Sequence, residues 1–356
     1  MMRPWPSNRP PALACALLTG TFLTGTLLTG TFLACSMAVA SQYPAATKSS
    51  AESAEQQDYR QYFTPLPSLP PIPADNSLTA EKVALGKMLF FEPRLSKSSN
   101  ISCASCHNPA LAWTDRLPTA VGHDGQTGER NSPTVLNSGF LGSQFWDGRE
   151  PDLEGQALGP IQNSIEMAHD LDGALARLSA VDGYSDHFQT AFPADEAPLS
   201  SGNLADAIAS FERTLNTPNA PLDRYLLGDE AALTDQQKAG MKDFVDVGCI
   251  SCHRGANFSD SLFHPIQVPG SDDLGRFAVT NEESDRQAFR TASLRNVALT
   301  YPYFHDGSAE TLEDVVPIMG EQMLKRELDE ATVERLVSFL HALTGEQPVV
   351  TVPALP

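Results

Sequence analysis

Apolar residues recur every three to four positions in four stretches of the chain, which is the period of an α-helix with one buried face. The stretches run from the cap Thr79 to the residue before Pro93, from Leu204 to Leu215, from Thr234 to Val245 and from Leu336 to Leu343. Pro93, Pro218 and Gly345 provide stop signals. No run of alternating strands competes with these helices. The pattern therefore predicts a mostly α fold with long connecting loops.

Breaks between the helical patterns divide the chain into segments. Residues 41–75 are rich in Ala, Ser and Gln and then in Pro, which is typical of an extended linker or surface strap. The break from Asn216 to Pro221 predicts a boundary between a domain of residues 76–217 and a second domain of residues 218–346, followed by a tail of residues 347–356. A length of 356 residues is sufficient for two domains with proper cores.

The first 40 residues have the features of a targeting segment. Arg3 and Arg9 precede an apolar run over residues 12–33, and a small-x-small cleavage site ends at Ala40. These features predict a signal peptide and a periplasmic protein. The apolar run is long enough to serve instead as an uncleaved membrane anchor, and residues 32–35 resemble a lipoprotein box.

Charge narrows the class of partner. The chain has 24 Lys and Arg against 44 Asp and Glu, for a formal charge of −20, and removal of Arg3 and Arg9 with the signal takes it to −22. Such an acidic chain is a poor ligand for nucleic acid or for an anionic membrane surface. A cationic or neutral partner fits the charge better.

The cysteines outside the targeting segment form two identical motifs. Cys103, Cys106 and His107 make one CxxCH, and Cys249, Cys252 and His253 make the second. Two thiols at this spacing can add to the vinyl groups of a haem, and the histidine that follows becomes the proximal iron ligand. Two covalently bound haem c groups are therefore predicted.

Two other interpretations of a CxxC pair exist. Four thiolates can bind Zn²⁺, but zinc ribbons place their pairs much closer together in sequence, and both pairs here carry the additional histidine. A thioredoxin-like redox pair is the second alternative, but it does not require the histidine that follows each CxxC here. Haem attachment accounts for all the residues of both motifs.

Together with other stretches of the sequence, these two motifs make the chain resemble the bacterial dihaem cytochrome c peroxidase family. The wider superfamily includes the MauG-type enzymes. The shared stretches are the two CxxCH motifs, Gln156 and residues 85–95, 130–135, 144–149, 165–167, 294–300 and 303–307. The resemblance covers nearly the whole chain after the targeting segment. It implies two cytochrome c-like domains, each wrapped around one covalent haem, and often a homodimer.

The resemblance also implies the axial ligands. It places Met319 opposite His253 on a high-potential haem, although the residues alone leave Met167, Met241 and Met323 as alternatives and allow Met319 to be a core residue. It places His123, in a glycine-rich loop, on the open face of the His107 haem, from which it swings away when the other haem is reduced. A lone loop histidine is otherwise a plain surface residue.

Catalytic residues follow from the same resemblance. Glu166 matches the distal glutamate that moves a proton during peroxide cleavage, and Gln156 and Pro160 match distal-pocket positions. Trp146 matches a residue between the haems that helps electrons cross. The alternatives are a solvated surface charge for Glu166 and a core position for Trp146.

A structural calcium ion is implied as well. Asn131, Thr300 and Pro302 match positions at which the family binds Ca²⁺ between the domains, through one side-chain oxygen and two backbone carbonyls. The spacing of these residues alone does not suggest a metal site. His305 lies in a shared motif and is expected to support the second haem pocket.

Together these features predict a periplasmic peroxidase that reduces hydrogen peroxide to water with electrons from a small cytochrome c or cupredoxin. Two alternatives remain. A MauG-like oxidase would act on a protein substrate, but it carries a Tyr at the position of Met319. A dihaem electron carrier would have no use for Glu166 or for a mobile His123 loop.

The negative charge of the chain generates a prediction about its donor. A basic donor is steered by the acidic surface, so the turnover rate should fall as the salt concentration rises. Steady-state turnover with a basic cytochrome c, measured over a range of ionic strength, checks this. Rate constants that do not change with ionic strength would exclude electrostatic steering.

Overall fold

The computed structural model describes residues 58–356, which lie in one compact unit. Eleven α-helices and one two-stranded sheet are found in this part of the chain, which confirms the prediction of a mostly α fold. None of its helices has the length and apolarity needed to cross a bilayer. The predicted signal peptide, residues 1–40, lies outside the described residues.

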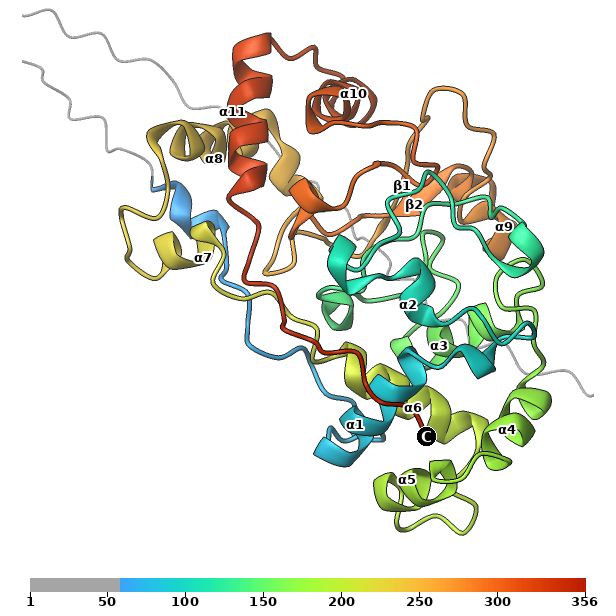
Figure 1. Cartoon of the computed structure of the whole chain (residues 1–356). Coiled ribbons are helices and arrows are strands. Elements are labelled where there is room, and N and C mark those ends of the chain that lie inside the picture. The colour runs from blue at the N-terminus through green and yellow to red at the C-terminus, as the bar shows by residue number, and fades with distance from the viewer. Residues whose placement is uncertain (1–57) are drawn as a thin grey trace, which may run out of the picture. The chain divides into compact units, whose positions relative to one another are not determined.

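The helices are distributed along the whole described chain (Figure 1). They are α1 (Ala80–Phe90), α2 (Cys103–Cys106), α3 (Leu153–Gln162), α4 (Leu171–Ser179), α5 (Tyr184–Ala191), α6 (Ser201–Glu212), α7 (Pro221–Leu226), α8 (Asp235–Val247), α9 (Phe277–Thr280), α10 (Leu312–Leu324) and α11 (Glu330–His341). Strands β1 (Phe263–Pro265) and β2 (Ala288–Arg290) pair antiparallel, with Phe263 opposite Arg290. Short 3₁₀ helices, such as Cys249–Ser251 and His123–Gly125, occur in the loops.

The four helices predicted from periodicity are all present, as α1, α6, α8 and α11. Thr79 caps α1 through a hydrogen bond from the Lys82 amide at 3.2 Å, and Thr234 caps α8 in a capping box with Gln237. Helices α3 and α10 contain an internal proline, Pro160 and Pro317, and were not predicted.

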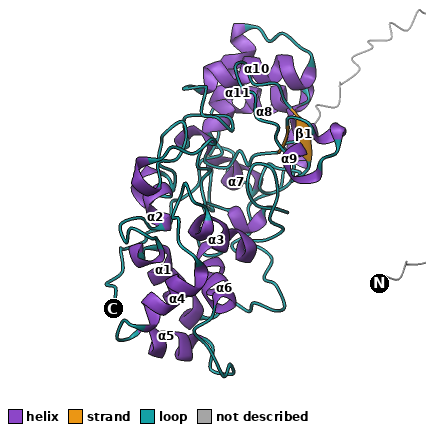
Figure 2. Ribbon diagram, turned by 90° about the vertical axis from the view of Figure 1, so that its right-hand side faces the viewer, coloured by secondary structure: helices purple, strands orange, loops and turns teal. Residues whose placement is uncertain are grey.

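The four predicted helices pack as two pairs, α1 against α6 and α8 against α11. Each pair meets at a glycine. A Cβ atom at Gly86 of α1 would lie 1.7 Å from the Ala207 carbonyl oxygen, and one at Gly240 of α8 would lie 1.9 Å from the Arg335 carbonyl oxygen. Only glycine allows such a close approach of the backbones. Figure 2 shows α8 and α11 gathered with α10 at one end, and α1 and α6 with α4 and α5 at the other.

Each helix pair belongs to a separate hydrophobic core. The first core lies within residues 85–215 and includes Phe90, Trp113 and Phe211 in mutual aromatic contact. The second core contains Phe63 together with residues from 222–343. The boundary between the cores falls near the predicted break at residues 216–221. The assignment of the chain to two domains stays a prediction.

Both ends of the described chain connect the two cores. Phe63 packs in the second core before the chain passes to α1, and the Leu66 amide donates to Asp223 Oδ1 at 3.1 Å. At the other end, residues after α11 return to the first core, where Val350 packs and the Pro356 carbonyl accepts a bond from Arg94 at 3.0 Å. Residues 58–75 and the tail therefore behave as straps.

The close approach at Gly86 generates a prediction about stability. Gly86→Ala should lower the free energy of unfolding by about 2 kcal/mol, because the new methyl group forces α1 away from α6. Gly202→Ala is the matched control, since Gly202 lies exposed in α6 and a Cβ atom there would meet no packed neighbour within 4 Å outside its own stretch of helix. It should raise stability by about 0.5 kcal/mol. Urea unfolding of both variants measures the difference, and equal effects would contradict the proposed contact.

Candidate functional site

The first CxxCH motif forms helix α2 and ends with its histidine held in place by the backbone. His107 Nδ1 lies 3.4 Å from the Trp113 carbonyl oxygen. Burial lowers the pKa of His107, so the imidazole is neutral, and the carbonyl fixes the proton on Nδ1. The Pro133 backbone also contacts the ring, and His107 lines the cavity described below. A metal-binding histidine is commonly held in this way, with one ring nitrogen oriented by a hydrogen bond.

The second motif repeats the arrangement. His253 Nδ1 lies 3.1 Å from the Phe258 carbonyl oxygen, and burial likewise lowers the pKa of His253. Trp113 and Phe258 both adopt left-handed backbone conformations, with φ of 61° and 51°. Large side chains rarely adopt this conformation, which costs about 1–3 kcal/mol. Both aromatic residues are buried in a core, which offsets that cost and aims each carbonyl at its histidine.

The two motifs line one cavity of about 670 Å³. His107 and His253 both reach it, as do Cys106, Cys249 and Cys252, while Cys103 packs against the first core. Burial raises the pKa of Cys106 to about 12 and that of Cys249 to about 11. The cavity walls are mainly apolar, with a few polar groups among them, as in cofactor sites. The residues present fit two haems held through these motifs.

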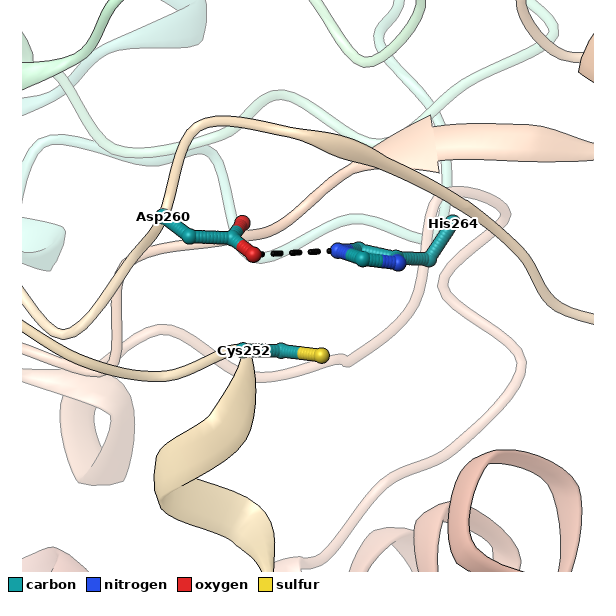
Figure 3. Close-up of side chains that lie close together, drawn as sticks. All are labelled: Cys252, Asp260 and His264. Atoms are coloured by element: carbon teal, nitrogen blue, oxygen red, sulfur yellow. Dashed lines mark hydrogen bonds and ion pairs between the residues drawn. The ribbon is translucent and has the colours of Figure 1, made fainter. Parts of the chain in front are cut away.

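A zinc site is not formed by the same cysteines. Among residues 58–356, only Cys252, Asp260 and His264 gather as a potential metal-binding group (Figure 3). The four CxxC sulfurs do not meet at one point, so the tetrathiolate alternative lacks its ligands. Asp260 and His264 instead form a pair, with 3.1 Å between Asp260 Oδ2 and His264 Nε2.

The predicted acid-base residues lie in the same cavity as His107. Gln156 and Pro160 come from α3, and Glu166 comes from the turn that follows. Asn163 Nδ2 donates to Glu166 Oε1 at 2.7 Å. Burial raises the pKa of Glu166, although Arg149 and Asn163 act in the opposite direction. A carboxyl with a raised pKa at a cavity wall can exchange protons near neutral pH.

His123 lies beside this group but does not line the cavity. Its backbone amide donates to the carbonyl oxygens of Ile165 and Glu166, both at 2.8 Å. Its Nδ1 is buried and has no hydrogen-bond partner among the described residues, and its Nε2 lies 3.3 Å from Asp124 Oδ2. The His123 loop is thus bonded to the segment that carries Glu166.

The methionines separate into two groups. Met167 is buried in the first core and Met241 in the second. Met319 and Met323 both line the cavity from α10, one helical turn apart on the same face. The structure therefore leaves these two as sources of a thioether ligand, and the assignment to Met319 stays a prediction.

The other predicted site residues line the cavity as well. Trp146 Nε1 donates to the Asn131 carbonyl oxygen at 2.9 Å. Asn131 Nδ2 donates to the Leu117 carbonyl oxygen, which leaves Oδ1 as an acceptor, and Thr300 and Pro302 lie in the same cavity wall. His305 is buried and stacks on Phe289 with 3.9 Å between ring centroids.

Several further charged or titratable residues reach the cavity without a role from the sequence analysis, and three of them come from regular elements. They are Glu212 of α6, His264 of β1 and Arg290 of β2. Burial raises the pKa of Glu212 to about 8, so this carboxyl is largely neutral at pH 7. Each is a single residue without a spacing signal, so only its burial could identify it.

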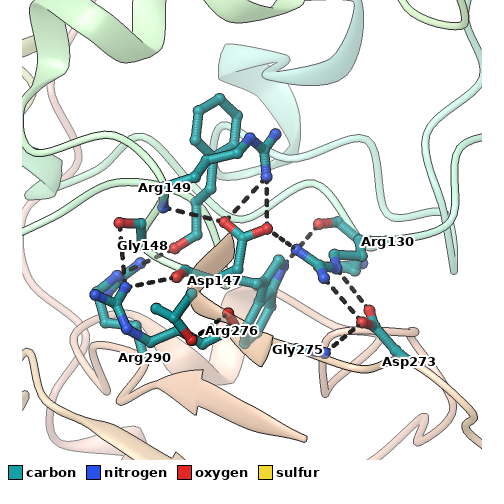
Figure 4. A network of polar contacts seen from close by, with 12 residues as sticks. Arg130, Asp147, Gly148, Arg149, Asp273, Gly275, Arg276 and Arg290 are labelled. Atoms are coloured by element: carbon teal, nitrogen blue, oxygen red, sulfur yellow. Dashed lines mark hydrogen bonds and ion pairs between the residues drawn. The ribbon is translucent and has the colours of Figure 1, made fainter. Parts of the chain in front are cut away.

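An ion-pair network connects segments beside the cavity (Figure 4). Arg130 Nη1 lies 2.6 Å from Asp147 Oδ2, and Arg130 Nε lies 2.6 Å from Asp273 Oδ2. Arg149 adds a second contact to Asp147 at 3.0 Å. Because Asp147 and Asp273 belong to distant parts of the sequence, Arg130 joins the segment that follows Trp146 to the segment that precedes α9.

Known proteins resemble this chain in sequence and in fold. The sequence model described as di-haem cytochrome c peroxidase matches residues 80–231. Cytochrome c551 peroxidase of Pseudomonas aeruginosa is 47% identical over 302 residues, which is 83% of this chain and 87% of the relative. Methylamine utilization protein MauG of Methylorubrum extorquens is 42% identical, over 82% of this chain and 86% of its own. A crystal structure of a MauG-like protein associated with microbial copper homeostasis aligns with a TM-score of 0.72 at 31% identity, over 80% of this chain and 94% of that one.

The Arg130 network generates a prediction about stability. Arg130→Gln should lower the free energy of unfolding by about 2–3 kcal/mol, because it leaves the buried Asp147 carboxylate and the half-buried Asp273 carboxylate short of a partner. Arg286→Gln is the control, since its ion pair with Glu283 is exposed and contributes little. Thermal or urea unfolding measures both, and a loss of the same size in the two variants would contradict a structural role for Arg130.

Proposed function

The chain belongs to the di-haem cytochrome c peroxidase family, and from this membership we propose that it reduces hydrogen peroxide to water in the periplasm. The proposed donor is a small cytochrome c or a cupredoxin. One observation carries the proposal: two oriented histidines, His107 and His253, share a cavity with a half-buried carboxyl, Glu166. The family is one of oxidoreductases, and the relatives named as cytochrome c peroxidases span most of the chain.

His107 and His253 are proposed as the proximal ligands of two haems joined through Cys103, Cys106, Cys249 and Cys252. Haem, when bound there, supplies iron that binds peroxide and exchanges single electrons. Met319 is proposed to complete the site of His253, because it lines the same cavity and matches the position at which the family places this ligand. A thioether ligand favours the reduced state, as an electron-accepting site requires.

Glu166 is proposed to move the proton. Reduction of one hydrogen peroxide to two waters consumes two electrons and two protons and breaks the O–O bond. In its ionised form, the Glu166 carboxylate takes a proton from one peroxide oxygen and returns it to the other, which leaves as water. Asn163 holds Oε1, so Oε2 is the oxygen that carries the proton. Gln156, in the same cavity, is proposed to orient the peroxide.

Three finer roles rest on the resemblance. Trp146 is proposed to help electrons pass between the two sites, since it lines the cavity that both motifs share. His123 is proposed to cap the first site in the oxidised protein and to leave it on reduction, and its position outside the cavity lining is compatible with the second arrangement. Asn131, Thr300 and Pro302 are proposed as calcium ligands, with Asn131 Oδ1 available as a hard oxygen donor.

The role of Glu166 generates a prediction about turnover. Glu166→Gln should lower kcat by about 10²–10⁴-fold, because the amide cannot accept the peroxide proton. In the unsubstituted protein, kcat should fall as the pH drops through the raised pKa of Glu166, since protonation removes the base. The variant should lack this acidic limb. Stopped-flow oxidation of reduced cytochrome c by peroxide, with Ca²⁺ present, measures both effects.

The matched control is Glu196→Gln, an exposed glutamate away from the cavity, which should leave the pH profile unchanged. The assay is run on fully oxidised and half-reduced protein. Turnover by the half-reduced form alone supports the His123 gate, and turnover by both forms removes the gate but keeps the peroxidase. Peroxide-dependent oxidation of a protein without cytochrome turnover would favour the MauG-like alternative. If the protein does not react with peroxide, the electron-carrier alternative is favoured.

A further inference from the structure

Arg290 is a buried cation at the wall of the shared cavity. It is the last residue of β2, and only 6% of its surface is exposed. Its position is fixed by the backbone: its amide donates to the Trp146 carbonyl oxygen at 2.8 Å, and β2 pairs it with Phe263 of β1. The side chain lies among the polar residues shown in Figure 4.

The guanidinium of Arg290 has no anionic partner in the described protein. Nε donates to the Phe145 carbonyl oxygen at 3.3 Å and Nη1 to the Thr291 carbonyl oxygen at 3.2 Å, and no carboxylate oxygen of residues 58–356 lies within 4 Å. The other buried arginines differ in this respect. Arg213 pairs with Glu154 at 2.7 Å, and Arg295 pairs with Asp223 at 2.8 Å.

An unpaired buried cation is costly. Burial lowers the pKa of Arg290 to about 10, which still leaves the group charged at neutral pH. Removing a charge from water is unfavourable unless an opposite charge meets it. Glu212 is a buried acid at the same cavity, but it is largely neutral and forms no ion pair with Arg290. A bound group that carries a carboxylate would supply the missing charge.

We infer that Arg290 binds a propionate carboxylate of the haem joined to Cys249 and Cys252. The inference rests on the proposed function, because it requires haem at the second motif. Haem carries two propionates, and the planar fork of a guanidinium matches a carboxylate through two parallel hydrogen bonds. The second haem is favoured by position: Thr291, Ala292 and Ser293 continue along the cavity wall, and the Ala292 backbone lies beside the His253 ring.

The inference gives Arg290 an electronic role in addition to an anchoring one. A positive charge beside the haem favours its reduced form, in which the iron carries one positive charge fewer. Arg290 thereby acts in the same direction as a thioether ligand on the electron-accepting haem. Its amide bond to Trp146 places the charge next to the residue proposed to pass electrons between the sites.

The test compares Arg290→Gln with Arg290→Lys and with the exposed control Arg286→Gln in the full haem-loaded chain. Arg290→Gln should lower the equilibrium constant for reduction of the second haem about tenfold, which is ~59 mV in midpoint potential. Arg290→Lys should keep most of the potential, because the charge remains. Both variants should shift the propionate-bending band in the resonance Raman spectrum, because the fork is lost. The control should change neither readout.

Covalent haem content, measured on the same samples, separates the inference from the proposed function. A wild-type chain without haem at the second motif would overturn both. Two haems per chain with unchanged potentials and an unchanged propionate band in Arg290→Gln would overturn the inference alone, as would a shift confined to the first haem. If Arg290→Gln does not fold, the test rests on Arg290→Lys, which keeps the buried charge. An unchanged propionate band in Arg290→Lys would then overturn the inference.

Discussion

The site depends on one interaction that occurs twice: a backbone carbonyl that holds the Nδ1 of a histidine. The carbonyls of Trp113 and Phe258 point at His107 and His253 because both residues adopt a left-handed conformation. Such a conformation persists only where the surroundings enforce it. Each aromatic side chain is therefore buried among other rings of its core, and the cores in turn are closed by the helix pairs that meet at Gly86 and Gly240.

The orientation of the two histidines explains how one cavity can contain two haem-binding sites. Both imidazoles are neutral and line the same cavity, whose walls are mainly apolar. The charged groups at the cavity wall differ in protonation state. Glu166 and Glu212 have raised pKa values, whereas Arg290 remains a cation. The protein therefore provides proton-exchanging groups and a fixed positive charge within one cavity.

Sequence reasoning identified those parts of the molecule that have a repeating or spaced signal. The helices α1, α6, α8 and α11 have a continuous apolar period, and the CxxCH motifs have a fixed spacing. Helices α3 and α10 were missed because Pro160 and Pro317 interrupt them, although tertiary packing keeps both helical. Sequence also could not separate Met241, a core residue, from Met323 at the cavity. The burial of Glu212 and Arg290 could not be predicted from the sequence either, because a single charged residue belongs to no periodic pattern or spaced motif.

The straps at the two ends have a consequence for how this architecture can be rearranged. Phe63, early in the described chain, packs in the second core, while Val350 and Pro356, at the end, contact the first. A single cut near residue 217 would therefore leave each half without a segment that its core contacts. Recombination between related genes at that one junction would combine cores from two proteins. Each core would then be contacted by a strap from the other protein. The two halves of the protein are thus expected to evolve as one unit, although each has a core of its own.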